Sequence, residues 1–238
     1  MDDEAKRLVE KSPPDAAEGF TVPGVIPIFP LPRTVLLPGE VLPLYIFEPR
    51  YREMVRDALG GHRVIGVVAI APGFEEDQPG APPVAHVGCA GLIIRHVELP
   101  EGRFLIWLLG VDKFAIREEM PSLTRYRQVR VALEPGVRSA GARRRPSEEL
   151  RLDLLAALPL LAEGGAGKAR PAIQLLSRAD DDQLVAGVAR LLNLPVARKQ
   201  RLLEARGSWD RLKFLRREVD DRVRARPEPP VFEPHELN

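Results

Sequence analysis

The sequence is short of the residues from which most chemical sites are built. It has one cysteine (Cys89), four histidines and an aromatic content of 5%. A single cysteine excludes an internal disulfide and a zinc site built on thiolates, and it is typical of a reducing compartment. The scarcity of aromatic rings leaves no obvious platform on which nucleic-acid bases could stack.

A charge excess and long apolar runs are also missing. The 35 basic and 34 acidic residues leave a net charge of +1, so the chain has no overall field that would attract nucleic acid or an anionic membrane. The start, MDDEAKRLVEKSPPD, is charged where a signal peptide would be apolar. No apolar run approaches the roughly 20 residues of a membrane span. We therefore expect a cytoplasmic protein with no membrane partner, and the near-neutral composition argues against a nucleic-acid partner.

The histidines and acidic residues give no pattern typical of a metal or catalytic site. None of His62, His86, His96 and His235 pairs with another at helical metal-ligand spacing, so we expect no metal. His86 and Cys89 are three residues apart in a strand-like run, where side chains at that spacing point to opposite faces, and we expect a buried cysteine. The acidic run 180–182 is explained by helix capping. The basic run 143–145 is typical of a solvated loop.

Two kinds of hydrophobic pattern follow one another along the chain. Up to about Glu134, short β-branched runs are separated by turn residues, and those at 63–70, 87–99, 103–116 and 126–133 predict strands. Pro100-Glu101-Gly102 predicts a hairpin in which Gly102 takes a positive φ. Closely spaced strands with short turns favour a mainly antiparallel or mixed barrel of about six strands.

One helix interrupts the strands. Segment 48–61 has Pro49 at a permitted first-turn position and ends on two glycines. Its apolar residues fall at helical spacing and predict one face against the barrel: Tyr51, Met54, Val55 and Ala58.

From Ser147 onward the hydrophobic period becomes about 3.6 residues. Helices are predicted in 147–164, 180–194, 195–205 and 208–223. We expect Ser147 and Ser208 to act as N-caps, Asp180 and Gln183 to form a capping box, and Pro159 to bend or break the first helix.

These patterns predict an α+β protein, in which a mainly antiparallel β-barrel lobe with one inserted helix is followed by an α-helical bundle lobe. The expected organisation is a flexible segment at 1–22, the barrel lobe at 23–135, a linker at 136–146, the helical lobe at 147–224 and a proline-rich tail at 225–238.

Three segments together resemble the N-terminal, substrate-binding domain of Lon proteases. They are IPIFPLPRTVLLPGEVLPLYIFEPRYREMV (26–55), LPEGRFLIWLLGVDKFAI (99–116) and LLNLPVARKQRLLEA (191–205). Lys113 stands where the family usually has arginine before Phe114. The resemblance covers roughly residues 24–224 and implies a PUA-like barrel followed by a helical lobe.

Lon's ATPase and Ser-Lys peptidase modules have no counterpart in the resemblance. The string closest to a phosphate-binding loop is AEGGAGKAR, which lacks the first glycine and the Ser or Thr after Lys168. We therefore expect a stand-alone, non-enzymatic form of the Lon domain that uses no cofactor.

The resemblance implies binding of unfolded or extended polypeptide segments, with a separate protease as a further partner. The prolines of 26–43 predict an interrupted sheet edge, and the junction beyond it predicts a contact rim formed by Phe47, Glu48, Arg50 and Tyr51. The alternative is that Phe47 and Tyr51 only close the barrel. Two other function classes stay open: a hydrolase with a dispersed site and a PUA-like RNA-binding module.

Overall fold

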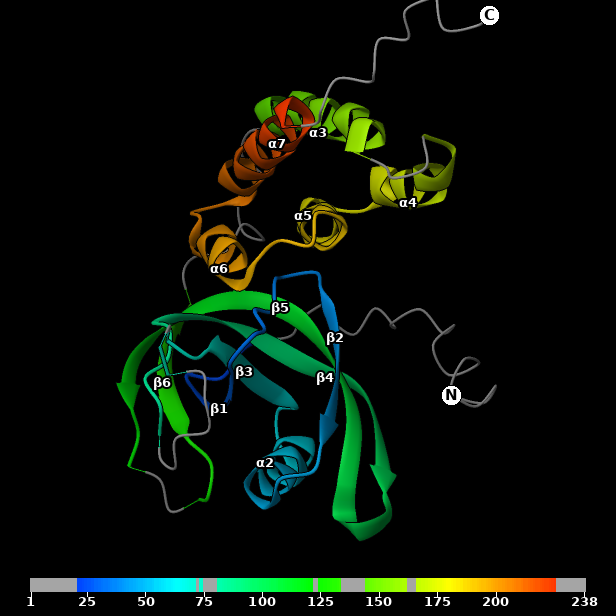
Figure 1. Cartoon of the computed structure of the whole chain (residues 1–238). Helices are drawn as coiled ribbons and strands as arrows, with labels where there is room; N and C mark the ends of the chain where they lie inside the picture. Colours follow the sequence, from blue (N-terminus) through cyan, green and yellow to red (C-terminus); the bar gives the residue numbers. More distant parts are fainter. Residues whose placement is uncertain are drawn as a thin grey trace, which may run out of the picture. The chain divides into compact units, whose positions relative to one another are not determined.

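The computed structural model describes residues 21–71, 73–74, 81–121, 124–133, 144–161 and 166–225. The chain forms two compact units, shown in Figure 1. The barrel unit comprises Met1–Ser139 and Leu194–Glu204, and the helical unit comprises Ala140–Asn193 and Ala205–Asn238. Most of the predicted flexible segment, linker and tail lies outside the described residues.

The barrel unit is built on one mixed sheet. Its six strands are β1 (Val25–Leu31), β2 (Val41–Ile46), β3 (Val64–Ala69), β4 (Val87–Leu99), β5 (Arg103–Glu119) and β6 (Gln128–Leu133), in the order β2-β5-β4-β3-β1-β6. A further pairing of β5 with β6 closes a ring of five strands and leaves β2 as an edge strand on β5. Among the pairings of these six described strands, β1–β3 alone is parallel. The predicted α+β class with a mainly antiparallel barrel is confirmed.

The proline-rich strand β1 is not at the sheet edge, contrary to the expectation from its prolines. It lies between β3 and β6 in the strand order. β6 is in register with its first half, Pro27 included, and β3 with its second half, Pro30 included. Because each half is registered with one neighbour, a missing N–H can face the open side, which is where proline is tolerated.

Helix α2 (Pro49–Gly60) packs against β1 and β5. Pro49 occupies its first turn, where a backbone donor is not needed. The predicted buried face is confirmed in full, since the four residues named from the sequence are the buried ones: Tyr51, Met54, Val55 and Ala58.

The long β4–β5 hairpin turns at Pro100–Gly102 as predicted, and Gly102 has a φ of 68°. Glu101 also adopts a positive φ, 65°. Arg52 of α2 donates to the Glu101 carbonyl, and Arg56 Nη2 donates to the Gly102 carbonyl at 3.4 Å. The helix therefore fixes the turn through side chains that the sequence pattern did not single out.

The barrel core is centred on the fully buried ring of Phe114. A Cβ atom at Gly66 or Gly88 would lie 2.8 or 2.7 Å from Phe114 Cζ. These two strands need glycine there because the ring occupies the space of a side chain.

Helix α6 (Val196–Glu204) belongs to the barrel unit, although the sequence pattern groups it with the other helices. Gln200 Nε2 donates to the Val87 carbonyl at 3.0 Å, and Lys199 Nζ pairs with Glu40 Oε1 at 3.2 Å. Lys113, the position that departs from the Lon pattern, is buried and donates to the Glu204 carbonyl at 3.4 Å. Polar contacts that no helical period can reveal thus attach this helix to the sheet.

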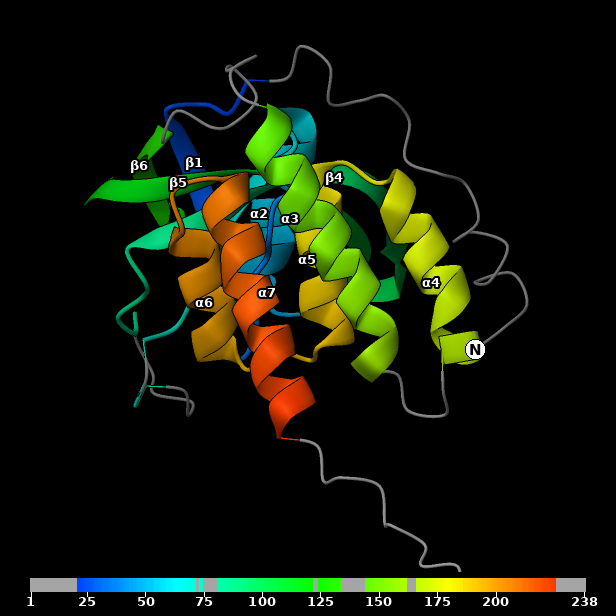
Figure 2. The same cartoon turned by 90° about the horizontal axis from the view of Figure 1, so that it is seen from above.

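The helical unit contains α3 (Arg144–Ala157), the short 3₁₀ segment η3 (Leu158–Leu161), α4 (Ala166–Arg178), α5 (Asp181–Leu191) and α7 (Ser208–Arg224). Helices α3 and α7 lie side by side (Figure 2). The break at Pro159 and the Asp180–Gln183 capping box are confirmed. The cap predictions at Ser147 and Ser208 are wrong, because α3 begins earlier and Gly207 precedes α7. Helix α4 was not predicted, because the glycines near its start and Pro171 inside it are typical of a turn.

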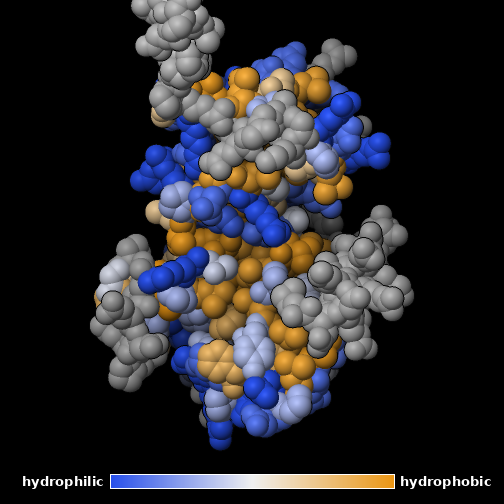
Figure 3. Space-filling model, turned by 45° about the vertical axis from the view of Figure 1, so that its right-hand side comes forward, coloured by the Kyte–Doolittle hydropathy of each residue, from blue (hydrophilic) through white to orange (hydrophobic). Residues whose placement is uncertain are grey.

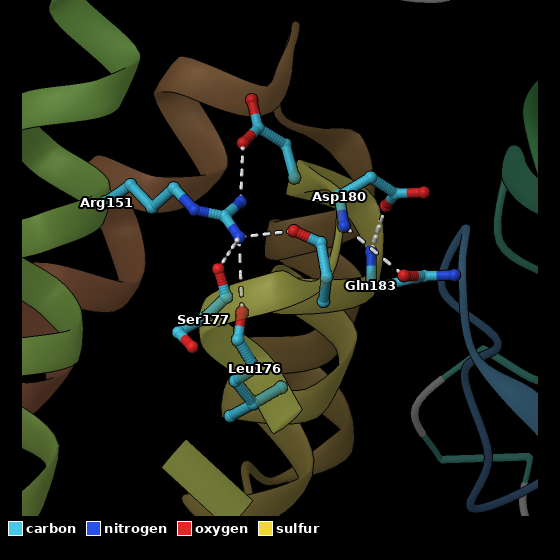
Figure 4. A network of polar contacts seen from close by, with 7 residues as sticks. Arg151, Leu176, Ser177, Asp180 and Gln183 are labelled. Carbon is cyan, nitrogen blue, oxygen red and sulfur yellow. Dashed lines mark hydrogen bonds and ion pairs between the residues drawn. The ribbon is translucent and has the colours of Figure 1, made fainter. Parts of the chain in front are cut away.

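One arginine ties three helices of this unit together (Figure 4). From α3, Arg151 Nη1 pairs with Asp181 Oδ1 of α5 at 3.1 Å. Its Nη2 donates to the carbonyls of Leu176 and Ser177, both at 3.2 Å, and to that of Ala179. These carbonyls lie at the C-terminus of α4, where intrahelical donors run out and the helix dipole favours a cation.

Candidate functional site

A cleft of about 470 Å³ opens on the barrel unit where β1 and β2 end and α2 begins. Its walls come from the second half of β1, the end of β2, the first turn of α2, and residues near positions 70–74, 81–82 and 125–127. Eleven of the eighteen lining residues are prolines or other apolar residues, and the other seven are three tyrosines, three arginines and Glu48. This composition is typical of a site that binds apolar groups.

All four residues of the predicted rim line this cleft. Phe47 and Glu48 occupy the junction between β2 and α2, and Arg50 and Tyr51 lie in the first turn of α2. Phe47 is 58% exposed, whereas Tyr51 is only 8% exposed. The structure brings the four together, but it separates the exposed Phe47 from the buried Tyr51. Their binding role stays a prediction.

Tyr51 forms the floor of the cleft. Its ring packs on Phe29 of β1 with 4.4 Å between the centroids. Burial raises the pKa of its hydroxyl. Tyr51 therefore stays neutral at physiological pH and contributes packing to the barrel.

Arg50 and Glu48 neutralise each other at the rim. Arg50 Nη2 lies 2.9 Å from Glu48 Oε2, and the guanidinium lies over the Tyr51 ring at 4.5 Å from its centroid. An exposed pair of this kind adds little stability. The pair holds Arg50 over the Tyr51 ring and leaves the four rim residues without net charge, so that an apolar group can approach them.

Two exposed aromatic residues of the cleft were missed by the sequence analysis, Tyr45 and Phe74. Tyr45 is 46% exposed, and its ring lies 5.8 Å from that of Phe47 between centroids. The signal was present in β2, where Val41, Pro43 and Tyr45 alternate along one side of the strand. For Phe74 the sequence offers no comparable signal.

Arg127 belongs to the wall and is fully engaged. Its Nε and Nη2 lie 2.7 and 2.8 Å from the two carboxylate oxygens of Glu119, and its Nη1 donates to the Pro82 carbonyl at 2.8 Å. The hydrogen bond from Arg127 lowers the pKa of Glu119. This pair positions strands and connecting segments around the cleft.

Tyr126 is buried and donates its hydroxyl to Asp57 Oδ2 at 2.7 Å. Burial and this hydrogen bond raise its pKa to about 12. The hydroxyl pKa values of Tyr51 and Tyr126 are thus both raised further above 7, whereas a general acid or base works best with a pKa near the operating pH.

The other chemistry-bearing residues do not converge. His62, His86 and His96 are exposed, while Cys89 is buried in β4 as expected. Among the residues that the structure describes, no cluster of three His, Cys, Asp or Glu side chains could hold a metal ion. His235 and Arg143 lie outside the described residues.

The helices of the described part of the chain were also compared with the length and apolarity that a membrane span requires, and none of them meets both criteria.

The fold defines a class of protein, a β-barrel domain combined with a helical unit. The chain belongs to the substrate-binding domain family of the ATP-dependent protease La (LON), whose family model matches residues 25–221. The resemblance inferred from the sequence is therefore confirmed.

Curated relatives and solved structures agree with this assignment. The chain is 31% identical over 129 residues to a Lon protease of Flavobacterium johnsoniae, covering 52% of this chain and 16% of that protein. It is 32% identical over 107 residues to Lon protease 2 of Myxococcus xanthus, covering 45% of this chain and 13% of that protein. The chain thus spans about a sixth or less of these relatives.

Two solved structures share the fold. The N-terminal domain of a Mycobacterium avium complex Lon protease matches with a TM-score of 0.62 and 20% identity, covering 83% of this chain and 98% of that one. A Lon N-terminal domain protein from Xanthomonas campestris matches with a TM-score of 0.55 and 22% identity, covering 85% of this chain and 99% of that one. At these identities the likeness concerns the fold.

Proposed function

We propose that this domain binds unfolded or extended polypeptide segments through the cleft at the start of α2, without catalysing a reaction on them. The observation that carries the proposal is the exposed ring pair of Tyr45 and Phe47 at a cleft whose neighbouring charges, Arg50 and Glu48, neutralise each other. An apolar side chain of a client can be buried there without stranding an unpaired charge. Folded proteins hide such side chains, so binding selects unfolded ones.

The role of each residue follows from its exposure. Phe47 and Tyr45 supply apolar contact area, and Tyr51 with Phe29 forms a rigid floor. The Arg50–Glu48 pair offers hydrogen-bonding groups to the client backbone at the rim. In an adaptor role, the bound segment would be delivered to a separate protease, and the family's substrate-binding description supports this direction.

The test is a fluorescence-anisotropy titration of the purified protein with labelled unfolded polypeptide and with its folded counterpart, at low and high salt. We expect selective, salt-tolerant binding of the unfolded form. Phe47→Ser should weaken it about tenfold or more, because burying a Phe side chain contributes about 1.5–3 kcal/mol. Leu133→Ser, an exposed apolar position on β6 away from the cleft, is the matched control. Equal binding of folded and unfolded forms, or equal effects of both substitutions, would refute the proposal.

The non-catalytic part has its own test. Incubation of the pure protein with unfolded casein and ATP should leave the casein intact in a gel assay. Reproducible cleavage that copurifies with the protein would contradict this part and leave the binding proposal standing.

A further inference from the structure

The outer face of the β2–β5–β4 sheet is largely apolar, and its residues are exposed or partly exposed in the part of the chain that the structure describes. Along β5, buried and partly exposed residues alternate strictly from Arg103 to Gly110. Three of these partly exposed residues, Arg103, Leu105 and Trp107, lie in register with partly exposed residues of β4, and the last two also lie in register with exposed residues of β2. We call these nine positions the outer sheet face: Val41, Pro43, Tyr45, Arg95, Val97, Leu99, Arg103, Leu105 and Trp107.

The outer sheet face is broad and continuous. Pro43 and Arg95 flank Trp107 in register, and Tyr45 and Val97 flank Leu105. Trp107 is only partly buried. Figure 3, which brings this side of the molecule forward, shows hydrophobic residues gathered over the barrel unit. Contiguous apolar surface of this kind marks an interaction site.

The charges of the outer sheet face are of one sign. Its two ionisable cations are Arg95 and Arg103, and none of its nine positions holds a carboxylate. The Arg95 guanidinium lies over the Trp107 ring, 5.0 Å from the centroid. Within the part of the chain that the structure describes, no carboxylate lies within ion-pair distance of Arg95.

Arg103 lies at the end of the outer sheet face nearest the β4–β5 turn. Its Nη1 donates to the Tyr45 hydroxyl at 2.8 Å, and its Nε is 3.7 Å from an oxygen of the largely exposed Glu101. Arg95 is partly exposed and the Arg103 side chain is 34% exposed. A partner carboxylate can therefore approach both guanidinium groups from the solvent, and at Arg103 it would displace the exposed Glu101. The complementary ligand combines apolar side chains with negative charge.

The mode of docking is constrained by Pro43. β2 is the edge strand, and an incoming strand would need its outward N–H groups, one of which proline removes. A ligand thus gains more by lying across the outer sheet face than by extending the sheet. Tyr45 belongs to both this face and the cleft, so the two surfaces are continuous.

We propose that the outer sheet face binds extended polypeptide segments in which large apolar residues stand next to aspartate or glutamate, with Arg95 and Arg103 receiving the carboxylates. This inference rests on the proposed polypeptide-binding function and adds a preference for one charge sign. Arg95 and Trp107 would act as a unit, since the stacked guanidinium presents its edge N–H groups outward.

The test uses two labelled peptides of the same length and the same Leu and Phe positions, one with glutamates and one with lysines between them. We expect the acidic peptide to bind roughly fivefold more tightly at low salt, and the difference to shrink as salt is raised. Arg95→Glu should abolish or reverse the preference, and Arg95→Gln should reduce it. The control is Arg117→Glu, the same charge change at an exposed position near the other end of β5.

The outcomes separate the two proposals. If both peptides bind equally and Arg95→Glu behaves like Arg117→Glu, the charge preference is refuted while the polypeptide-binding function stands. If neither peptide binds and unfolded polypeptide does not bind either, both proposals are refuted. Arg95→Glu is checked for folding by thermal unfolding, and Arg95→Gln supplies the reading if the charge reversal unfolds the sheet.

Discussion

The rings of Tyr51 and Phe29 pack at 4.4 Å between their centroids, inclined by 53°, and both residues are buried. Tyr51 comes from the first turn of α2 and Phe29 from β1, so this contact joins the inserted helix to the closed barrel. Four residues earlier, Phe47 reaches into solvent. Of the two aromatic residues of the predicted rim, Tyr51 therefore packs inside the barrel unit, whereas Phe47 lies at its surface.

This division predicts opposite results for two substitutions. Tyr51→Ala should lower the free energy of unfolding by about 3–5 kcal/mol, because it removes a buried ring and leaves a cavity beside Phe29. Phe47→Ala should change it by about 0.5 kcal/mol or less while weakening polypeptide binding. Urea denaturation of both variants, paired with anisotropy titrations, measures the two effects. A similar stability loss in both would show that Phe47 also closes the barrel.

Residues whose role depends on a local pattern could be predicted from the sequence. The buried face of α2 follows from helical spacing, the Pro100–Gly102 turn from its glycine, and the start of α5 from Asp180 and Gln183. Each of these depends on contacts within a few positions of the chain. The four predicted rim residues lie at such a local junction, so their shared position could be predicted, while their binding role stays a prediction.

Features that depend on distant neighbours could not be predicted. The prolines of β1 indicated an edge, but β3 and β6 share that strand between them. The period of α6 indicated a bundle helix, yet Lys199 and Gln200 attach it to the barrel unit. Tyr45 and Trp107 required the register of three strands before their common face became visible. Tertiary context decides such cases.

Gly110 predicts a second stability effect. A Cβ atom there would lie 2.1 Å from the Leu37 carbonyl oxygen, because the chain near Leu37 approaches β5 closely. Gly39 N donates to the Gly110 carbonyl at 2.8 Å, and Gly110 N donates to the Glu40 carbonyl at 2.9 Å, so neither segment can withdraw without losing hydrogen bonds. Gly110→Ala should cost about 1–3 kcal/mol or more in unfolding free energy.

The matched control for Gly110 is Gly60→Ala in α2. No atom lies within 4 Å of a Cβ built at Gly60, and alanine is favoured over glycine in a helix by about 0.5–1 kcal/mol. This variant should therefore be neutral or slightly stabilised in the same denaturation experiment. Equal losses at both glycines would contradict the close approach of Leu37.

Tyr126 predicts a pH dependence on the alkaline side. Its pKa is raised from 10.0 to about 12 by burial and by the hydrogen bond to Asp57. Above pH 10 the unfolded state releases the phenol proton while the folded state keeps it. The stability contributed by this group is therefore complete below about pH 10 and is lost between about pH 10 and 12.

Urea denaturation from pH 8 to pH 11.5 checks this expectation. Tyr126→Phe should be less stable than the wild type at pH 8, since it leaves Asp57 without its donor. The difference between the two proteins should shrink as the pH rises. Parallel curves across the whole range would show that Tyr126 does not titrate with the raised pKa.

Arg151 predicts a loss confined to the helical unit. Removing its side chain leaves the carbonyls at the end of α4 and the Asp181 carboxylate without this donor. Arg151→Ala should cost about 1–3 kcal/mol, and Arg151→Lys should restore only part of it, because an ammonium group cannot reproduce the planar fork. Native-state hydrogen exchange should show faster exchange in α4 and α5 but unchanged protection in β3 and β4.

Arg217→Ala, at an exposed position of α7, is the control and should leave exchange unaltered. If Arg151→Ala raised exchange uniformly in both units, Arg151 would support the stability of the whole chain, and its predicted role as a local clamp on α4 and α5 would be wrong.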